Sequence, residues 1–215
     1  KSSLIAALSG SRPFGGTVRL RGQDIKTLSP RSRARMVGVL SQRQAVHYAF
    51  TVEEVVRLGR YAHRKSWLSG GDPGSDQAVE QALCWTGMGE LRRRSILSLS
   101  GGERQRAFLA QVLVQDPDIL MLDEPSGALD LKYQQKLFEL TGDWVRRPGK
   151  AVISVVHDLS IARRYGSHAL LMRKGACIAQ GGKEEVLSPD NLNAAYGMDV
   201  YSWMRQLALP WAGPA

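Results

Sequence analysis

Cysteine and long apolar runs are both scarce in this chain of 215 residues. The two cysteines, Cys84 and Cys177, lie far apart and form no metal-ligand spacing. We therefore expect buried or idle thiols in a reducing compartment. No apolar run reaches the roughly 18 residues that a membrane-spanning helix requires. With 43% hydrophobic and 23% charged residues, the composition is that of a globular protein with a substantial core.

Acidic residues are outnumbered by basic ones, which leaves a formal net charge of +9. Such a charge raises nucleic acid or an anionic membrane surface as partners. The tightest basic clusters are Arg31, Arg33 and Arg35, then Arg92, Arg93 and Arg94, then Arg146 and Arg147. No aromatic residues are interleaved with them to form a base-stacking platform. We therefore interpret the clusters as solvated faces, with a bias toward a membrane as the functional alternative.

The stretch from Ser98 to Asp130 carries the strongest functional signal. Its apolar run 119–122 is bounded by turn residues and is too short for a helix, so it predicts a buried parallel strand. Asp123 and Glu124 follow directly, and ligands bind at the carboxyl ends of strands in open α/β sheets. One acid there can hold a magnesium shell while the other orients a water, which is what phosphoryl transfer needs.

A helix start precedes this strand. Ser100 followed by Glu103 is a capping-box pattern, which predicts a helix whose first backbone N–H groups are free. The glycines Gly101 and Gly102 allow another molecule to approach the backbone closely, and a helix N-terminus favours phosphate. An ordinary capped helix would explain the capping box alone, but not the acid pair that follows the strand.

Together these residues resemble the signature motif, Walker B motif and D-loop of ATP-binding-cassette (ABC) ATPases. The resemblance implies an α/β fold: a P-loop NTPase-like parallel-sheet core with an antiparallel β portion and an inserted helical subdomain. It implies one ABC ATPase domain over residues 1–215. Residues 1–42 and 98–215 would form its nucleotide-binding core, and residues 43–97 its helical subdomain.

The first residues resemble the end of a P-loop, although Lys-Ser-Ser alone is nearly worthless as a motif. By that resemblance Lys1 would bind the β- and γ-phosphates, Ser2 would ligate magnesium and Ser3 would lie near the α-phosphate. The Gly-rich loop and its strand do not precede Lys1 in this sequence. We therefore expect a fragment, from an incomplete reading frame or a truncation, and a non-catalytic remnant stays as an alternative.

Several further elements fit the same family. Residues 17–21 alternate between polar and apolar side chains before a turn predicted at 22–24, which indicates an antiparallel strand. Ser29-Pro30 opens a short basic helix. A short strand at 36–40 ends near Gln42, which resembles the Q-loop glutamine that contacts magnesium and the attacking water. Helical patterns dominate from 43 to 97, with Thr51 as an N-cap and a helix from Asp76 to about Thr86.

The C-terminal third predicts a helix over 131–147, a buried strand over 151–156 and a hairpin of 169–172 with 176–179 about Lys174-Gly175. A lone histidine is more often structural than catalytic. His157, however, ends a core strand that follows the Asp-Glu strand, as the switch histidine of ABC ATPases does.

The resemblance implies a reaction and a set of partners. ATP would be hydrolysed with Mg²⁺ in a homodimer that sandwiches two nucleotides, and Glu124, His157 and Gln42 would act in catalysis. Ser2, Gln42 and Asp123 would hold the metal. Ser100, Gly101 and Gly102 would bind the partner's nucleotide, and Asp130 would link the two sites.

Two further segments indicate the subfamily. Residues 50–63 and the tail 189–200 resemble the ATPases of iron–siderophore, haem and cobalamin importers. Ala62, where a proline is usual, and Ser126-Gly127-Ala128 depart from the family pattern. The expected partners are membrane permease subunits at the cytoplasmic face of the inner membrane and, indirectly, a substrate-binding protein. An ABC ATPase that acts on nucleic acid or ribosomes is the alternative, although nucleic acid is not the expected partner.

The absent Gly-rich loop leads to a binding prediction. Each hydrogen bond from a backbone N–H group to charged phosphate contributes roughly 1.5–3 kcal/mol. Losing three would cost on the order of 5 kcal/mol, a loss of about a thousandfold or more in affinity. We expect the 215-residue chain to bind ATP poorly and a version with a Gly-rich loop and strand ahead of Lys1 to bind well. Equal ATP affinity of the two in a calorimetric titration would contradict this.

Overall fold

The computed structural model describes residues 1–41, 48–63, 72 and 74–211. The predicted site residue Gln42 lies outside these described residues. The chain groups into two compact units, one of Ser2–Val156 and one of Lys1 with the residues from His157 onward.

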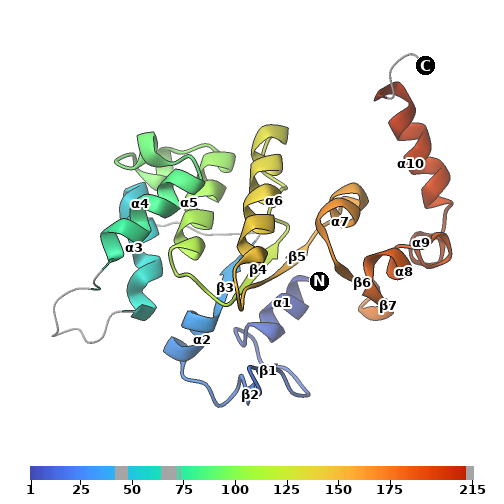
Figure 1. The fold of residues 1–215 in the computed structure, drawn as a ribbon. Coiled ribbons are helices and arrows are strands. Elements are labelled where there is room, and N and C mark those ends of the chain that lie inside the picture. The colour runs from blue at the N-terminus through green and yellow to red at the C-terminus, as the bar shows by residue number, and fades with distance from the viewer. Residues whose placement is uncertain (42–47, 64–71, 73, 212–215) are drawn as a thin grey trace. The chain divides into compact units, whose positions relative to one another are not determined.

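A parallel sheet forms the centre of the first unit (Figure 1). Its order is β3 (Val37–Leu40), β4 (Ile119–Asp123) and β5 (Ala151–Val155). β4 is the middle strand, and both of its neighbours run parallel to it. Leu120, Met121 and Leu122 are almost fully buried, as a strand covered on both faces requires. The buried parallel strand predicted at 119–122 is confirmed.

Helix α1 (Ser2–Leu8) packs on this sheet through Ile5, which shares a core cluster with Met121. The antiparallel pair β1 (Arg19–Leu20) and β2 (Gln23–Asp24) adds Leu20 to the same cluster. The position predicted for the turn between them, residues 22–24, was wrong. Arg21 and Gly22 form it, with φ of 49° and 82°, because a two-residue turn with both φ positive matches the twist of a hairpin.

The predicted basic helix is α2 (Pro30–Met36), and Ser29 caps it. Helices α3 (Val52–Leu58), α4 (Ser75–Trp85) and α5 (Gly101–Leu113) form a separate group with one hydrophobic core (Figure 1). The 3₁₀ turns η1 (Gly59–His63), η2 (Gly89–Leu91) and η3 (Ile96–Ser98) connect them. Thr51 caps α3 with a complete capping box, so the predicted N-cap is confirmed.

Helix α6 (Leu131–Arg146) confirms the helix predicted after Asp130 and buries Leu137, Phe138 and Trp144. Cys84, on α4, is an exposed free thiol, as is Cys177 in the second unit. Of the two alternatives for these thiols, buried or idle, burial was therefore wrong, and idle thiols stay a prediction. None of the helices in the described ranges is both long and apolar enough to cross a bilayer.

The second unit contains the predicted hairpin. Strands β6 (His168–Arg173) and β7 (Ala176–Gly182) pair antiparallel about Lys174-Gly175, so the prediction is confirmed and the strands are longer than expected. The remaining elements are α7 (Leu159–Tyr165), α8 (Lys183–Val186), α9 (Pro189–Tyr196), α10 (Val200–Ala208) and η4 (Leu209–Trp211). Leu187, Leu192 and Val200 form the core of this unit.

Close packing of α3 against α5 depends on Gly59. A Cβ atom at Gly59 would lie 2.6 Å from Val114 Cγ1 and would collide with the carbonyl oxygen of Gln111. We expect Gly59→Ala to lower the free energy of unfolding by about 1–3 kcal/mol, because neither backbone can move away without opening the core. Gly142→Ala in α6 is the matched control, because a Cβ there meets nothing within 4 Å.

The control should raise the free energy of unfolding by about 0.5–1 kcal/mol, since alanine is the better helix former. Urea denaturation of both variants checks the prediction. Equal midpoints for Gly59→Ala and the unchanged chain would contradict the close packing.

Candidate functional site

The two acids that follow the central strand lie in different environments. Asp123 is the last residue of β4 and is only 6% exposed. Its Oδ1 atom is buried and has no hydrogen-bond partner among the described residues. Strand alternation places Asp123 on the same face as Met121, which is the face that α1 covers. A buried carboxylate oxygen without a partner is costly, so this position suits a bound cation or its water shell.

Glu124 leaves the strand through an unusual backbone conformation. Its φ is +53°, in the left-handed region that non-glycine residues rarely adopt, while its N–H group donates to Val155 O at 3.1 Å. Such a conformation costs on the order of 1–3 kcal/mol and is most frequent at functional sites. The turn releases Glu124 from strand alternation, so the two neighbouring carboxylates need not point to opposite faces.

The turn after Glu124 leads directly into α6. Asp130 caps that helix, because one of its carboxylate oxygens accepts a hydrogen bond from Tyr133 N at 2.9 Å. Within the turn, Gly127 N donates to Glu124 O at 3.3 Å, and Leu129 N donates to Ser126 O at 3.1 Å. The segment between the acid pair and α6 is thus an ordered turn.

The predicted capping box at the start of α5 is confirmed. The Ser100 hydroxyl accepts from Glu103 N at 3.3 Å, and Glu103 Oε2 accepts from Ser100 N at 2.8 Å. The hydrogen bonds from Ser100 lower the pKa of Glu103. A Cβ at Gly102 would lie 3.0 Å from Ala128 O, whereas one at Gly101 would meet nothing closer than 4.0 Å. Gly102 therefore allows the turn to pack against α5, while the backbone at Gly101 has open space beside it.

Polar side chains that sequence reasoning missed connect α5, the turn and α6. Gln105 donates to the carbonyl oxygen of Pro125. Gln134 Nε2 donates to Ser126 O at 3.2 Å and to Leu129 O at 3.0 Å. The available signal was weak: a glutamine within a helix rarely indicates more than a solvated face.

Arg106 makes a second connection between α5 and α6. It is 8% exposed, and its guanidinium lies 3.8 Å from the centre of the Tyr133 ring. The same group donates to Thr86 O and Gly87 O at 3.1 Å each. The sequence pattern does not indicate this burial, because Arg106 directly follows the three polar residues 103–105.

The remaining predicted residues lie at the ends of elements. Ser2 and Ser3 begin α1. In the second unit, Lys1 Nζ lies 3.3 Å from His157 Nδ1, which is hydrogen-bond distance. Asp158 follows His157 and caps α7 by accepting from Ser160 N at 2.7 Å. The structure thus brings Asp123, Glu124 and the turn together with the start of α5 in one unit, and Lys1 with His157 in the other.

The donor set fits magnesium. Within the part of the chain that the structure describes, no three histidine, cysteine or acidic side chains cluster to hold a metal ion. Magnesium does not require such a cage, because it commonly takes one or two carboxylates, several waters and substrate phosphates. Asp123, buried at a strand end with an unpartnered oxygen, fits this role.

A parallel α/β sheet whose central strand ends at Asp123, with Glu124 directly after it and a capped helix start nearby, is typical of a P-loop-type ATPase domain. Comparison with known proteins narrows this class. The sequence profile described as "ABC transporter" matches residues 1–127. The hemin import ATP-binding protein of Pseudomonas entomophila (strain L48) is 42% identical over 206 residues, which cover 93% of this chain and 78% of that protein.

The ferric enterobactin transport ATP-binding protein of Escherichia coli (strain K12) is 37% identical over 92% of this chain and 73% of its own length. A solved metal-chelate type ABC transporter in an inward-facing conformation superposes with a TM-score of 0.75 at 25% identity, over 92% of this chain and 73% of that one. A dimeric bacterial ABC transporter cassette shares the fold, with a TM-score of 0.76 at 23% identity over 85% and 80%. The chain therefore belongs to the ABC transporter family, among its ATP-binding subunits.

The hydrogen bonds of Gln134 lead to a stability prediction. We expect Gln134→Leu to lower the free energy of unfolding by about 1–3 kcal/mol, because two carbonyl oxygens of the turn each lose the hydrogen bond from Gln134. Gln135→Leu is the matched control, since Gln135 is exposed and donates only to Glu139 at 2.8 Å. Thermal unfolding by circular dichroism measures both. A control that destabilises as much as Gln134→Leu would show that the bonds to the turn contribute nothing.

Proposed function

We propose that this chain is the ATP-hydrolysing subunit of an importer for a metal-chelate ligand of the hemin, cobalamin or siderophore type. The observation that carries the proposal is the acid pair at the end of β4, with a buried unpartnered oxygen on Asp123 and a left-handed turn at Glu124. Relatives named for hemin, cobalamin and ferric enterobactin transport support the ligand class.

Asp123, Ser2 and Gln42 would hold magnesium. When bound, this ion supplies positive charge that offsets the charge of the phosphate oxygens. Asp123 is suited to the task because its buried oxygen lacks a protein donor. Lys1, Ser2 and Ser3 would bind the phosphate chain of ATP.

Glu124 would act as the general base or would orient the attacking water. His157 and Gln42 would assist, the histidine by donating a hydrogen bond to the γ-phosphate. Catalysis of phosphoryl transfer rests mainly on positioning and on stabilisation of charge, so rigid placement of these side chains is what the protein must supply. The strained backbone of Glu124 supports this role, because its conformation is held by the surrounding structure.

Two copies of the chain would complete each site. Ser100, Gly101 and Gly102 would contact the nucleotide bound by the partner, and Asp130 would link the two sites. Three observations support this arrangement: the capped start of α5, the open space beside Gly101, and the bonds that tie α5 to the turn between Glu124 and Asp130. The fold is also that of a cassette solved as a dimer.

The permease would dock on the helical group at the cytoplasmic face of the membrane. Charged side chains of this group are weak candidates for the contact, because Arg57 pairs with Glu53 and Asp76, and Arg60 pairs with Asp72. Exposed apolar side chains are better candidates, since a docking face needs apolar area that water can leave. Those near α3 are Tyr48, Phe50, Leu58 and Tyr61.

The nucleic-acid alternative gains no support from the basic clusters, because most of their arginines have protein partners. Arg31 and Arg35 donate to Ala62 O, and Arg33 donates to Gly10 O. Arg92, Arg146 and Arg147 form ion pairs. A guanidinium held in this way is less able to contact phosphates.

The assignment of Glu124 is tested by Glu124→Gln in a version that carries a Gly-rich loop ahead of Lys1. We expect ATP binding to persist and turnover to fall by orders of magnitude, because the amide cannot accept a proton. A nucleotide-locked dimer should accumulate on size-exclusion chromatography with ATP. The control is Glu139→Gln, an exposed glutamate on α6. Near-normal phosphate release from Glu124→Gln would remove Glu124 from the catalytic role.

A further inference from the structure

The start of α3 is hydrogen-bonded to the segment that leads into α5. Val52 N donates to Arg94 O at 3.0 Å and Glu53 N donates to Arg92 O at 2.9 Å. Thr51 forms an isolated antiparallel bridge with Ser95. Residues 50–53 and 92–96 are therefore joined side by side, although some forty positions separate them in the sequence.

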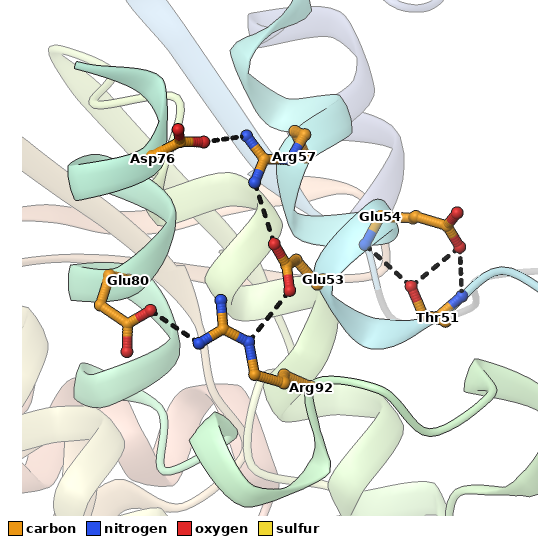
Figure 2. Close-up of polar contacts among 7 residues, drawn as sticks. All are labelled: Thr51, Glu53, Glu54, Arg57, Asp76, Glu80 and Arg92. Atoms are coloured by element: carbon orange, nitrogen blue, oxygen red, sulfur yellow. Dashed lines mark hydrogen bonds and ion pairs between the residues drawn. The ribbon is translucent and has the colours of Figure 1, made fainter.

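A chain of five charged side chains reinforces this junction (Figure 2). Glu53 is central: its Oε1 accepts from Arg57 at 2.9 Å and its Oε2 from Arg92 at 3.0 Å. Arg92 also donates to Glu80 on α4 at 2.9 Å, and Arg57 donates to Asp76. The hydrogen bond from Arg92, more than that from Arg57, lowers the pKa of Glu53. Glu53 and Arg92 thus connect α3, α4 and the segment before α5.

Only a short, ordered segment separates Arg92 from the helix start. Ile96 is fully buried and Leu99 nearly so, and both belong to the core that α3, α4 and α5 share. Ser98 Oγ donates to Ser95 O at 2.8 Å within η3, and Ser100 then caps α5. A displacement of Arg92 would therefore pass to Ser100 through a segment with little freedom to absorb it.

We propose that Glu53 and Arg92 are a positioning pair that fixes the start of α5, so that the backbone at Ser100, Gly101 and Gly102 is preorganised to bind the nucleotide of a second subunit. This inference rests on the proposed function for its consequence in catalysis. Its structural part, the immobilisation of residues 96–104, is independent of ATP. Neither residue of the pair touches substrate; both act through the position of α5.

The first test follows amide hydrogen exchange in the 215-residue chain. Glu53→Gln keeps the size of the side chain but removes its charge. We expect exchange in residues 96–104 to accelerate severalfold while exchange in β4 stays unchanged. Arg92→Lys, which keeps a charge but cannot bridge Glu53 and Glu80 as a planar fork, should give a smaller increase. Asp143→Asn, which removes the exposed pair of Asp143 with Arg146 on α6, is the control and should change neither segment.

The pH dependence of amide exchange supplies a second readout. Because the pKa of Glu53 is lowered in the folded state, its contribution is present above the unfolded pKa and is lost as pH falls through the folded value. After correction for the intrinsic exchange rate, exchange at 96–104 in the unchanged chain should rise at low pH. The rise should be smaller in Glu53→Gln, which lacks the carboxylate that titrates. Equal exchange in the two proteins at neutral pH, or equal acceleration in β4 and in 96–104, would overturn the proposal.

The kinetic test uses the version with a Gly-rich loop ahead of Lys1. We expect Glu53→Gln to lower kcat severalfold and to raise the protein concentration that gives half-maximal activity, while ATP affinity of the monomer stays unchanged. Arg92→Lys, the milder change, should lower kcat by a smaller factor. An unchanged kcat would overturn the link to catalysis. Absence of ATP hydrolysis in the parent protein would instead defeat the proposed function and leave the exchange result to decide the structural part.

Discussion

Burial of the Asp123 carboxylate at the end of β4 is the constraint on which the other features of the site depend. A strand covered on both faces places its last side chain in a poorly hydrated position, and a charged oxygen there requires a cation, a donor or water. The described residues supply no donor to Oδ1. The position is tolerable because the strand ends at this residue and the backbone turns away at Glu124. Under the proposed function, this end of β4, although unfavourable for stability, would suit magnesium and phosphate.

Specific polar contacts connect the helix start at Ser100 to the turn that follows β4. Gln105, Gln134 and the stacking of Arg106 on Tyr133 tie α5 to the turn and to α6. The ion pair of Glu53 with Arg92 connects the segment that precedes α5 to α3. The open backbone beside Gly101 therefore lies between two sets of contacts. Under the proposed function such restraint would strengthen binding of the nucleotide, because an N–H group contributes most when its orientation is fixed beforehand.

Local patterns in the sequence predicted those features that depend on neighbouring residues. The strand at 119–122, the capping box at Ser100, the cap at Thr51 and the hairpin about Lys174-Gly175 follow from burial, side-chain capping and turn chemistry, and all are confirmed. The turn near Gly22 was predicted one residue too late. Arg21 continues the alternation of polar and apolar residues, although it already belongs to the two-residue turn. The contacts of Gln105, Arg106 and Gln134, and the left-handed backbone of Glu124, could not be predicted. They depend on which helices meet in space, and a polar side chain within a helix gives no sign of its distant partner.

Under the proposed function, each catalytic site would need the acid pair of one molecule and the helix start of another. The most direct test mixes two inactive variants, each in the version with a Gly-rich loop ahead of Lys1. One is Glu124→Gln. The other is Gly101→Asp, which the open space at Gly101 and the favourable position of an acid in the first turn allow the fold to accept, but which repels phosphate.

A mixed dimer contains one site with both defects and one site with none. We predict that phosphate release, absent from either variant alone, returns when the two are mixed. A mixture as inactive as its components, although mixed dimers form, would contradict it.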